Sequence, residues 1–217
     1  MNQENFWKII KQKLKVIFVV SFVVAACVFT ISTIIKPKYR SDISVLVVQK
    51  QPEDKVDAFS AAKSAEYLSD IFSKIIFTDS FIDDVLQSPV GVKNVYSTNK
   101  EDRKKEWEKE VSVKKVNNTG IIEISVFDPS RKEAEKVAQA IASNLATNNQ
   151  KYHGGGDKIV ISVIDGPVTT QNPATPNIPL NILIGFVMGL IGTVGYLYFF
   201  GKEEPEYRAL DHYHEIR

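Results

Sequence analysis

Residues 16–35 of this chain read VIFVVSFVVAACVFTISTII, and residues 180–200 read LNILIGFVMGLIGTVGYLYFF. Neither stretch contains a charged residue. A helix rises 1.5 Å per residue, so about twenty residues cross a hydrocarbon core of roughly 30 Å. A helix buried in a soluble core seldom runs this long without a polar stripe. Both stretches are therefore predicted to be transmembrane helices, and they enclose most of the remaining chain between them.

The charges around the two spans predict their orientation. Residues 1–15 carry a net charge of +3, whereas residues 36–179 hold 20 basic and 20 acidic residues. Basic residues beside a span stay in the cytoplasm, while long loops cross the membrane largely regardless of charge. We therefore expect a cytoplasmic N-terminal tail, an extracytoplasmic domain over residues 36–179 and a second cytoplasmic tail over residues 201–217.

One alternative for the first span is a lipoprotein signal. Val24-Ala25-Ala26-Cys27 matches a bacterial lipoprotein cleavage box, which would make Cys27 the lipidated first residue of the mature chain. The apolar run, however, continues to Ile35, whereas mature lipoproteins normally turn polar after the cysteine. A signal peptide also has a shorter apolar region, of about 7–15 residues. The sequence favours an uncleaved span with Cys27 inside it.

Composition and motifs exclude several classes of protein. The net charge of +1 lacks the basic excess of a nucleic-acid binder, and one cysteine with three histidines offers little material for a disulfide framework or a metal centre. The chain has no GxxxxGK[ST], GxSxG or HExxH motif. We therefore expect no enzymatic activity, no cofactor and no metal site.

Three weaker patterns also have plain structural explanations. Asp83 and Asp84 are adjacent on a predicted helix, so their carboxylates should point apart. Gly154–Gly156 could cradle a phosphate, but no helix start follows it, which favours a loop. Residues 211–215 (DHYHE) include metal-ligand types, yet in a helix the two histidines would diverge, which favours a polar tail.

The external domain contains alternating strand and helix patterns. Strands are predicted at residues 41–48, 111–116, 121–127 and 158–165, and helices at 59–76, around 81–87, near 101–110 and from Ser130 onward. Without the extra helices, the order is β-α-β-β-α-β, the split βαβ arrangement of ferredoxin-like domains, and the fold class is α+β. The charged run at 101–110 is expected to be a solvated helix face, with a subunit contact as the alternative.

Finer expectations concern the ends of these elements. Thr98 with Glu101, and Ser130 with Glu133, have the spacing of a helix capping box. The strand at 158–165 (KIVISVID) is apolar on both faces, which predicts a covered or central strand.

Two non-catalytic motifs adjoin the second span. Pro173, Pro176 and Pro179 recur at every third residue, which favours a stiff polyproline II spacer. Within the span, four glycines lie along one helical strip and predict a face for close helix packing. These glycines are Gly185, Gly189, Gly192 and Gly195.

Several short motifs accompany the two spans. They are PKYRS (37–41) before the first strand, DSF (79–81), VFDP (126–129), and VIDGP (163–167) followed by PATPNIP. Together these features resemble the polysaccharide co-polymerases, or Wzz-type chain-length determinants, over almost the whole chain. The resemblance is strongest to the short Gram-positive modulators of a capsular tyrosine kinase.

The resemblance implies a non-enzymatic homo-oligomer in the bacterial plasma membrane that sets the length of a surface polysaccharide. It implies action beside a membrane polymerase on a lipid-linked glycan, and a cytoplasmic tyrosine kinase as partner through residues 201–217. That tail, GKEEPEYRALDHYHEIR, is acidic and matches no kinase-activating motif residue by residue. A membrane-anchored sensor that signals through a partner is the alternative class, because two spans around an external domain also describe many receptors.

Overall fold

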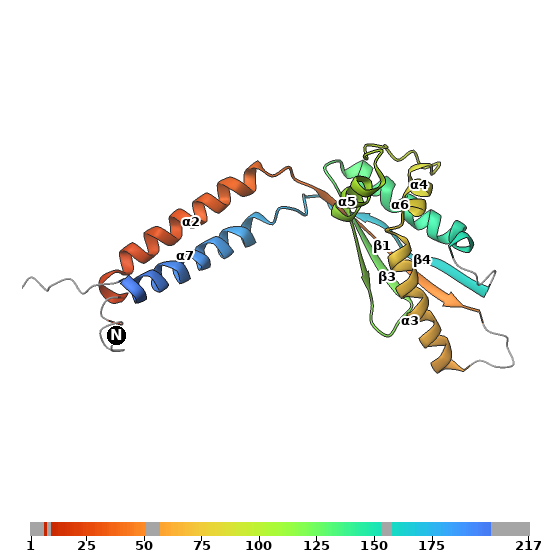
Figure 1. Ribbon diagram of the computed structural model, residues 1–217, viewed down its shortest axis with the longest axis horizontal. Coiled ribbons are helices and arrows are strands. Elements are labelled where there is room, and N and C mark those ends of the chain that lie inside the picture. Colours follow the sequence, from red (N-terminus) through yellow and green to blue (C-terminus); the bar gives the residue numbers. More distant parts are fainter. Residues whose placement is uncertain (1–6, 8–9, 51–56, 153–157, 201–217) are drawn as a thin grey trace, which may run out of the picture. The chain divides into compact units, whose positions relative to one another are not determined.

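A computed structural model describes residues 7, 10–50, 57–152 and 158–200. The 201–217 tail, the triple glycine and the DHYHE pattern therefore lie outside the described residues. The chain divides into two compact units, one built from residues 1–35 and 177–217 and the other from residues 36–176. The first unit contains two long helices, α2 (Leu14–Ile34) and α7 (Ile178–Phe200), which correspond to the two predicted spans (Figure 1).

The second unit is built on a four-stranded antiparallel sheet. Its strands are β1 (Tyr39–Gln49), β2 (Val111–Lys115), β3 (Ile121–Asp128) and β4 (Ile159–Thr169). They lie side by side in the order β2-β3-β1-β4, and all three neighbouring pairs are antiparallel. This mixed architecture is α+β, as predicted.

The position of β4 corrects one expectation. The apolar run at 158–165 predicted a covered or central strand, but β4 is an edge strand that pairs only with β1 among the described strands. Only Ile159 and Ile161 are buried there, while Val163 is 42% exposed and Ile164 50% exposed. The register between β1 and β4 also shifts at two places, between Asp42 and Ser44 and between Ser44 and Val45. The apolar residues on both faces of β4 thus belong to an exposed edge strand of the sheet.

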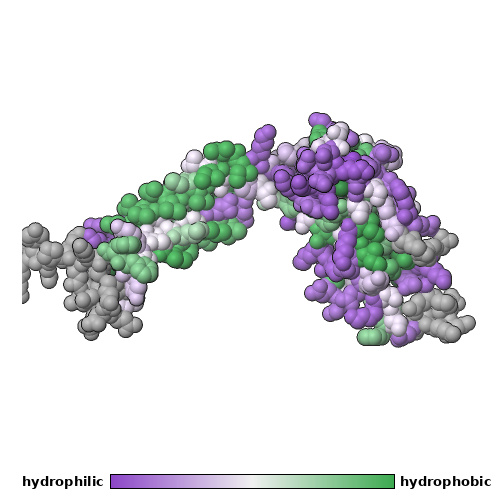
Figure 2. All heavy atoms as spheres, in the orientation of Figure 1, coloured by the Kyte–Doolittle hydropathy of each residue, from purple (hydrophilic) through white to green (hydrophobic). Residues whose placement is uncertain are grey.

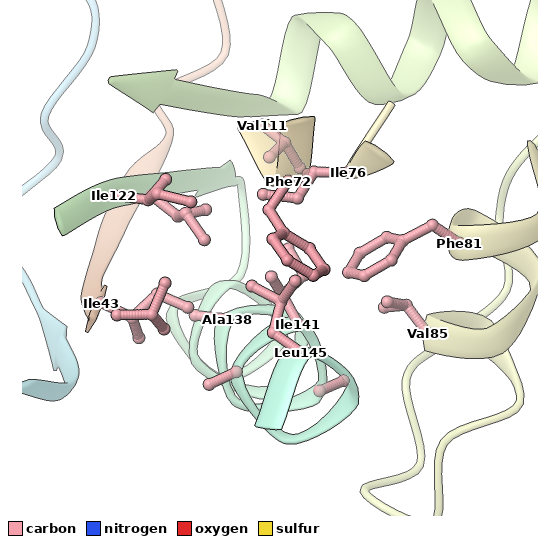
Figure 3. Packing of buried hydrophobic residues seen from close by; sticks show 14 of the residues in the cluster. Ile43, Phe72, Ile76, Phe81, Val85, Val111, Ile122, Ala138, Ile141 and Leu145 are labelled. Atoms are coloured by element: carbon pink, nitrogen blue, oxygen red, sulfur yellow. The ribbon is translucent and has the colours of Figure 1, made fainter. Parts of the chain in front are cut away.

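Helices cover one face of this sheet. They are α3 (Ala58–Ile75), α4 (Asp79–Leu86), α5 (Lys100–Glu110) and α6 (Arg131–Asn148), the last continued by a 3₁₀ turn at Asn149–Lys151. Alternate residues of β1 are buried beneath α3 and α6, because successive side chains of a strand point to opposite faces. Figure 3 shows Phe72 of α3 and Ile141 of α6 meeting Ile43 and Ile122 of the sheet. The amphipathic stripes of both helices therefore form one core with the sheet.

The helix starts follow local side-chain chemistry, with two corrections. The Asn99 side chain caps α5 by accepting from the amides of Glu101 and Asp102, so Thr98 is not the cap. The Ser130 side chain caps α6 by accepting from the Glu133 amide, as expected. The carboxylate of Glu133, however, accepts from the amide of Lys93 in place of the Ser130 amide. Only half of the predicted capping box forms, because the Ser130 amide donates to Asp128 Oδ1 at 2.5 Å instead.

The β2–β3 hairpin is held against β1 by a glycine. The amide of Val47 donates to the carbonyl of Gly120 at 2.8 Å, and a Cβ on Gly120 would collide with the carbonyl oxygen of Val47. Asn118 in the turn has a φ of 59°, a left-handed conformation that asparagine tolerates better than most residues. The Asn-rich tetrapeptide 117–120 is therefore a tight connection between β2 and β3.

Candidate functional site

The two long helices expose hydrophobic side chains over most of their surface. Figure 2 shows hydrophobic residues along both α2 and α7. Phe22 of α2 is 72% exposed and Met188 of α7 is 66% exposed. Among the described residues, α2 and α7 are the two helices that are long enough and apolar enough to cross a membrane. A core helix of a soluble protein would bury such side chains, so this surface suits a lipid environment.

Small residues form the contact between α2 and α7. A Cβ on Gly189 would lie 2.6 Å from the Cα of Ser21, and one on Gly185 would lie 2.8 Å from the Cγ2 of Val28. Both distances are too short for a real side chain, so the two backbones approach closely only because these positions are glycine. The buried positions of α7 are Gly185, Gly189, Thr193 and Leu197, which repeat every four residues along one stripe.

The other two predicted packing glycines lie elsewhere on α7. A Cβ on Gly192 or Gly195 would have no neighbour within 4 Å. Gly195 instead lines an apolar hollow of about 480 Å³ with Leu190, Ile191, Val194 and Tyr198. Whether this part of the strip packs against another copy stays a prediction.

Polar side chains between the two helices are paired. The side-chain amide of Asn181 donates to the hydroxyl of Ser32 at 3.0 Å and thereby joins α7 to α2. The Ser21 and Thr193 hydroxyls donate to backbone carbonyls four residues earlier in their own helices. Such pairing matters in an apolar medium, because an unsatisfied polar group there costs several kcal/mol.

In the α+β unit, the segments that lead to the two helices are bonded to each other. The amide of Lys38 donates to the carbonyl of Thr175 at 2.9 Å, and the amide of Ala174 donates to the carbonyl of Lys38 at 2.8 Å. The amide of Thr170 donates to the carbonyl of Arg40 at 2.8 Å. We call this end of the sheet, where the chain enters β1 and leaves β4, the linker end.

The three predicted spacer prolines occupy different settings. Pro173 and Pro176 flank Ala174 and Thr175, the two residues bonded to Lys38. Pro179 lies in the first turn of α7, where the missing N–H of proline is tolerated. The side chain of Asn177 accepts from the amide of Leu180 at 3.2 Å and caps this turn. The polyproline II spacer stays a prediction, and Pro179 belongs to the helix.

A pocket of about 400 Å³ opens at the linker end of the α+β unit. Asp128, which closes β3, pairs with Tyr39 at the start of β1 and lines this pocket. The loop before α5 contributes Tyr96, and the end of α5 contributes Glu110. The remaining lining residues are Lys93, Val95, Pro129, Ser130, Glu133 and Val137.

The polar groups of the pocket form a defined network. The Tyr96 hydroxyl donates to Glu110 Oε2 at 2.6 Å, and Lys38 Nζ lies 3.9 Å from Glu110 Oε1. Burial, together with the hydrogen bond to Glu110, raises the pKa of Tyr96, so the phenol stays a donor at physiological pH. Burial also acts to raise the pKa of Glu133, but bonds from Lys136 and the Lys93 amide outweigh it and hold that pKa below its usual value. The Glu133 carboxylate therefore stays ionised and acts only as a hydrogen-bond acceptor.

The sequence patterns do not single out this pocket. Tyr96 and Glu110 come from a loop and a charged helix without periodic signal. Asp128 and Pro129 lie in the motif VFDP, which carries the family resemblance, and Ser130 and Glu133 form the predicted capping box. The pocket combines the Tyr96 ring with carboxylate hydrogen-bond acceptors. Among the described residues, no cluster of three or more histidine, cysteine or acidic side chains could hold a metal ion.

A separate group of charged side chains links α4 to α5 and to the 3₁₀ turn after α6. Asp83 accepts from Arg103 at 2.7 Å, whereas Asp84 accepts from Lys151 and from the hydroxyl of Tyr152. The two neighbouring carboxylates therefore point to different partners, as the sequence predicted. Arg103 also bonds Asp79 and so ties α5 to the start of α4.

The chain has two apolar helices of membrane-spanning length, and an α+β domain lies between them in the sequence. These features define the class of membrane-anchored proteins. Comparison with known proteins adds a similarity to one family: residues 4–89 match the family model of the Wzz chain length determinant protein.

Relatives along most of the chain agree with this match. Capsular polysaccharide type 8 biosynthesis protein cap8A of Staphylococcus aureus is 21% identical over 88% of this chain and 82% of its own length. Capsular polysaccharide biosynthesis protein CpsC of Streptococcus agalactiae is 23% identical over 85% of this chain and 77% of its own length. CpsC of Streptococcus pneumoniae is 26% identical over 84% of this chain and 75% of its own length. The resemblance predicted from the sequence, to the short Gram-positive type of the Wzz family, is confirmed.

Proposed function

We propose that this protein is a non-enzymatic regulator of the chain length of a surface polysaccharide, with a capsule as the polymer. The observation that carries the proposal is the match of residues 4–89 to chain length determinants together with relatives named for capsular polysaccharide biosynthesis over 84–88% of the chain. The absence of catalytic motifs in the sequence agrees with a regulatory role. We also propose that the α+β unit has the split βαβ arrangement of ferredoxin-like domains. The strand order β2-β3-β1-β4 supports this assignment.

The membrane arrangement is part of the same proposal. Residues 16–35 and 180–200 span the plasma membrane, both termini lie in the cytoplasm, and residues 36–179 lie outside. The four lysines among residues 1–15 support this orientation. The partners are further copies of the chain, a membrane polymerase and its lipid-linked glycan. Residues 201–217 are the part available to a cytoplasmic tyrosine kinase.

The linker-end pocket is where we place contact with the glycan. Sugar hydroxyls are hydrogen-bond donors, and Glu110, Asp128 and Glu133 supply carboxylate acceptors around one cavity. The cavity volume of about 400 Å³ lies in the range of small-molecule sites. Its position at the end of the sheet that carries both linkers suits a glycan held on a membrane lipid.

The test is the size distribution of surface polysaccharide in a strain that lacks this gene. We expect the distribution to become broader or to shift in modal length, and the parent pattern to return on complementation. Polysaccharide of unchanged length and amount in the deletion strain would contradict the proposal. A deletion that changes only a transcriptional response would favour the sensor alternative.

A further inference from the structure

Both outer edges of the sheet are open among the described residues. No described strand pairs with the outer side of β2 or of β4. On β4, Val163, Ile164 and Val168 are 42%, 50% and 59% exposed. Beside β2 lies a hollow of about 350 Å³ lined by Phe77, Glu108 and the β2 residues Val111 to Val113. An apolar open edge invites pairing with another strand, and folded proteins usually cover or charge it.

The backbone groups on these edges are directed outward. The Val116 amide donates to the Ile121 carbonyl, so the even-numbered residues of β2 face β3. Because alternate residues of a strand bond to opposite sides, Val113 and Lys115 direct their amides and carbonyls to the outer edge. On β4, the Lys158 carbonyl accepts from the Lys50 amide at the end of β1, so the even-numbered residues of this part of β4 face β1. By the same alternation, the backbone groups of Val163 are directed outward.

The strand directions allow an antiparallel junction between the two different edges of equally oriented copies. Three antiparallel pairings separate β2 from β4, so these two edge strands run in opposite directions. The β4 edge of one copy can therefore pair antiparallel with the β2 edge of another without turning either copy over. Antiparallel pairing of two β4 strands would instead point the linker ends of the two copies in opposite directions. Copies inserted the same way into one membrane cannot adopt that arrangement.

The register adds charge complementarity to this direction. Lys114 pairs with Glu123, Glu123 with Ser44, and Ser44 with Asp165, so Lys114 and Asp165 occupy the two ends of one row across the sheet. Copies held at one depth by their spans would bring Asp165 of one copy beside Lys114 of the next. In the adjacent row, the same logic brings Val163 beside Lys115, where both backbones are directed outward. Parallel pairing of two β4 strands would instead place Asp165 against Asp165.

We propose that copies of this chain join head to tail, with the β4 edge of one copy extending the sheet of the next at its β2 edge. Such a junction uses different surfaces on its two sides, so it closes into a ring or extends in the membrane plane. Pro167 has no amide hydrogen and limits the pairing to the part of β4 before it. The inference rests on the proposed self-association and membrane orientation and specifies the surfaces that carry it.

Cysteine cross-linking of the full-length protein in membranes tests the junction. In a Cys27→Ser background, Lys114→Cys combined with Asp165→Cys should give a ladder of disulfide-linked oligomers on oxidation. Neither single variant should cross-link, but their co-expression should give dimers only. Within one chain the two positions are three strand spacings apart, about 14 Å, which is too far for a disulfide. Glu123→Cys with Asp165→Cys is the matched control, because Glu123 is exposed but lies on the inner strand β3.

Charge exchange provides an independent arm. Lys114→Glu and Asp165→Lys should each lower the oligomer fraction of detergent-solubilised protein severalfold by light scattering, and the double exchange should restore it. The Lys114→Glu change also puts a second carboxylate beside Glu123 in both the single and the double variant, so recovery in the double variant reports the contact between copies. Cross-linked dimers from Asp165→Cys alone, or no ladder from the double-cysteine variant when amine cross-linking shows oligomers, would overturn the inference. Polysaccharide length in a deletion strain is measured separately, so the proposed function can fail or hold independently.

Discussion

Gly189 of α7 packs directly on the backbone of Ser21 of α2, because a Cβ at position 189 would lie only 2.6 Å from the Ser21 Cα. This contact belongs to one chain. The glycine strip therefore has an internal side, Gly185 and Gly189, and a side at Gly192 and Gly195 without a neighbour within 4 Å. The two sides can be separated experimentally.

Gly189→Leu should force α2 and α7 apart and destabilise the helix pair by about 1–3 kcal/mol, the usual cost of overpacking. The measurement is thermal stability of the purified protein in detergent. Gly192→Leu is the matched control, since it adds the same side chain where space is open. Equal losses of thermal stability in both variants would show that Gly189 is not needed for the close contact between α2 and α7. A loss of oligomers without loss of stability in Gly192→Leu would assign the open side to contacts between copies.

Acid should destabilise the α+β unit in a defined window. Hydrogen bonds from Lys115 and then Lys74 lower the pKa of Asp70 from its ordinary value of 3.8 to about 2. A depressed folded-state pKa contributes stability above the unfolded-state value, and this contribution is lost as pH falls toward the folded-state value. We therefore expect stability to fall between about pH 4 and pH 2, and less steeply in Asp70→Asn.

Chemical denaturation of the residue 36–176 unit at a series of pH values checks this expectation. Lys115→Met should flatten the same part of the profile, because it removes the larger cause of the shift. Parent and Asp70→Asn curves that stay parallel from pH 4 to pH 2 would show that this ion pair does not contribute.

Filling the linker-end pocket should alter polysaccharide length without unfolding the domain. Val95 lines the pocket and is 62% exposed, so Val95→Trp adds bulk at its mouth while removing little packing. We expect a shifted length distribution on polysaccharide gels. Tyr67→Trp, at a 67% exposed position of α3, is the control and should leave the pattern unchanged. An unaltered pattern in a well-expressed Val95→Trp strain would sink the assignment of the glycan to this pocket.

The sequence predicted the elements far better than their neighbours in space. Local patterns predict the two spans, the core helices α3 and α6, and the β2–β3 hairpin. They can do so because apolar runs, helical stripes and turn residues act over a few positions. The cap of α5 was misplaced by one residue, and Glu133 bonded a tertiary donor in place of its predicted local one. Local chemistry identifies where a helix starts but not which distant amide competes for a side chain.

The edge position of β4 and the pocket depend on the assembled sheet. Valine and isoleucine on both faces of a strand indicate that both faces are apolar, and this is equally true of a central strand and of an edge that another chain covers. Tyr96 and Glu110 are 14 residues apart and bond only because α5 returns beside the loop before it. Such pairs have no signal in a single sequence.

The proline segment provides the last prediction, because the structure separates its members. Pro173 and Pro176 flank the two residues that bond Lys38, so they restrict the backbone where the two linkers are joined. Pro179 lies in the first turn of α7, where alanine is equally acceptable. Replacing Pro173 and Pro176 with Ala should therefore loosen the linker end and change the polysaccharide length distribution, while Pro179→Ala alone should not. Protease resistance of the external domain should match the parent in all variants, since the core contains none of these prolines. If the double variant keeps both the parent length pattern and normal expression, these prolines do not set the geometry that controls length.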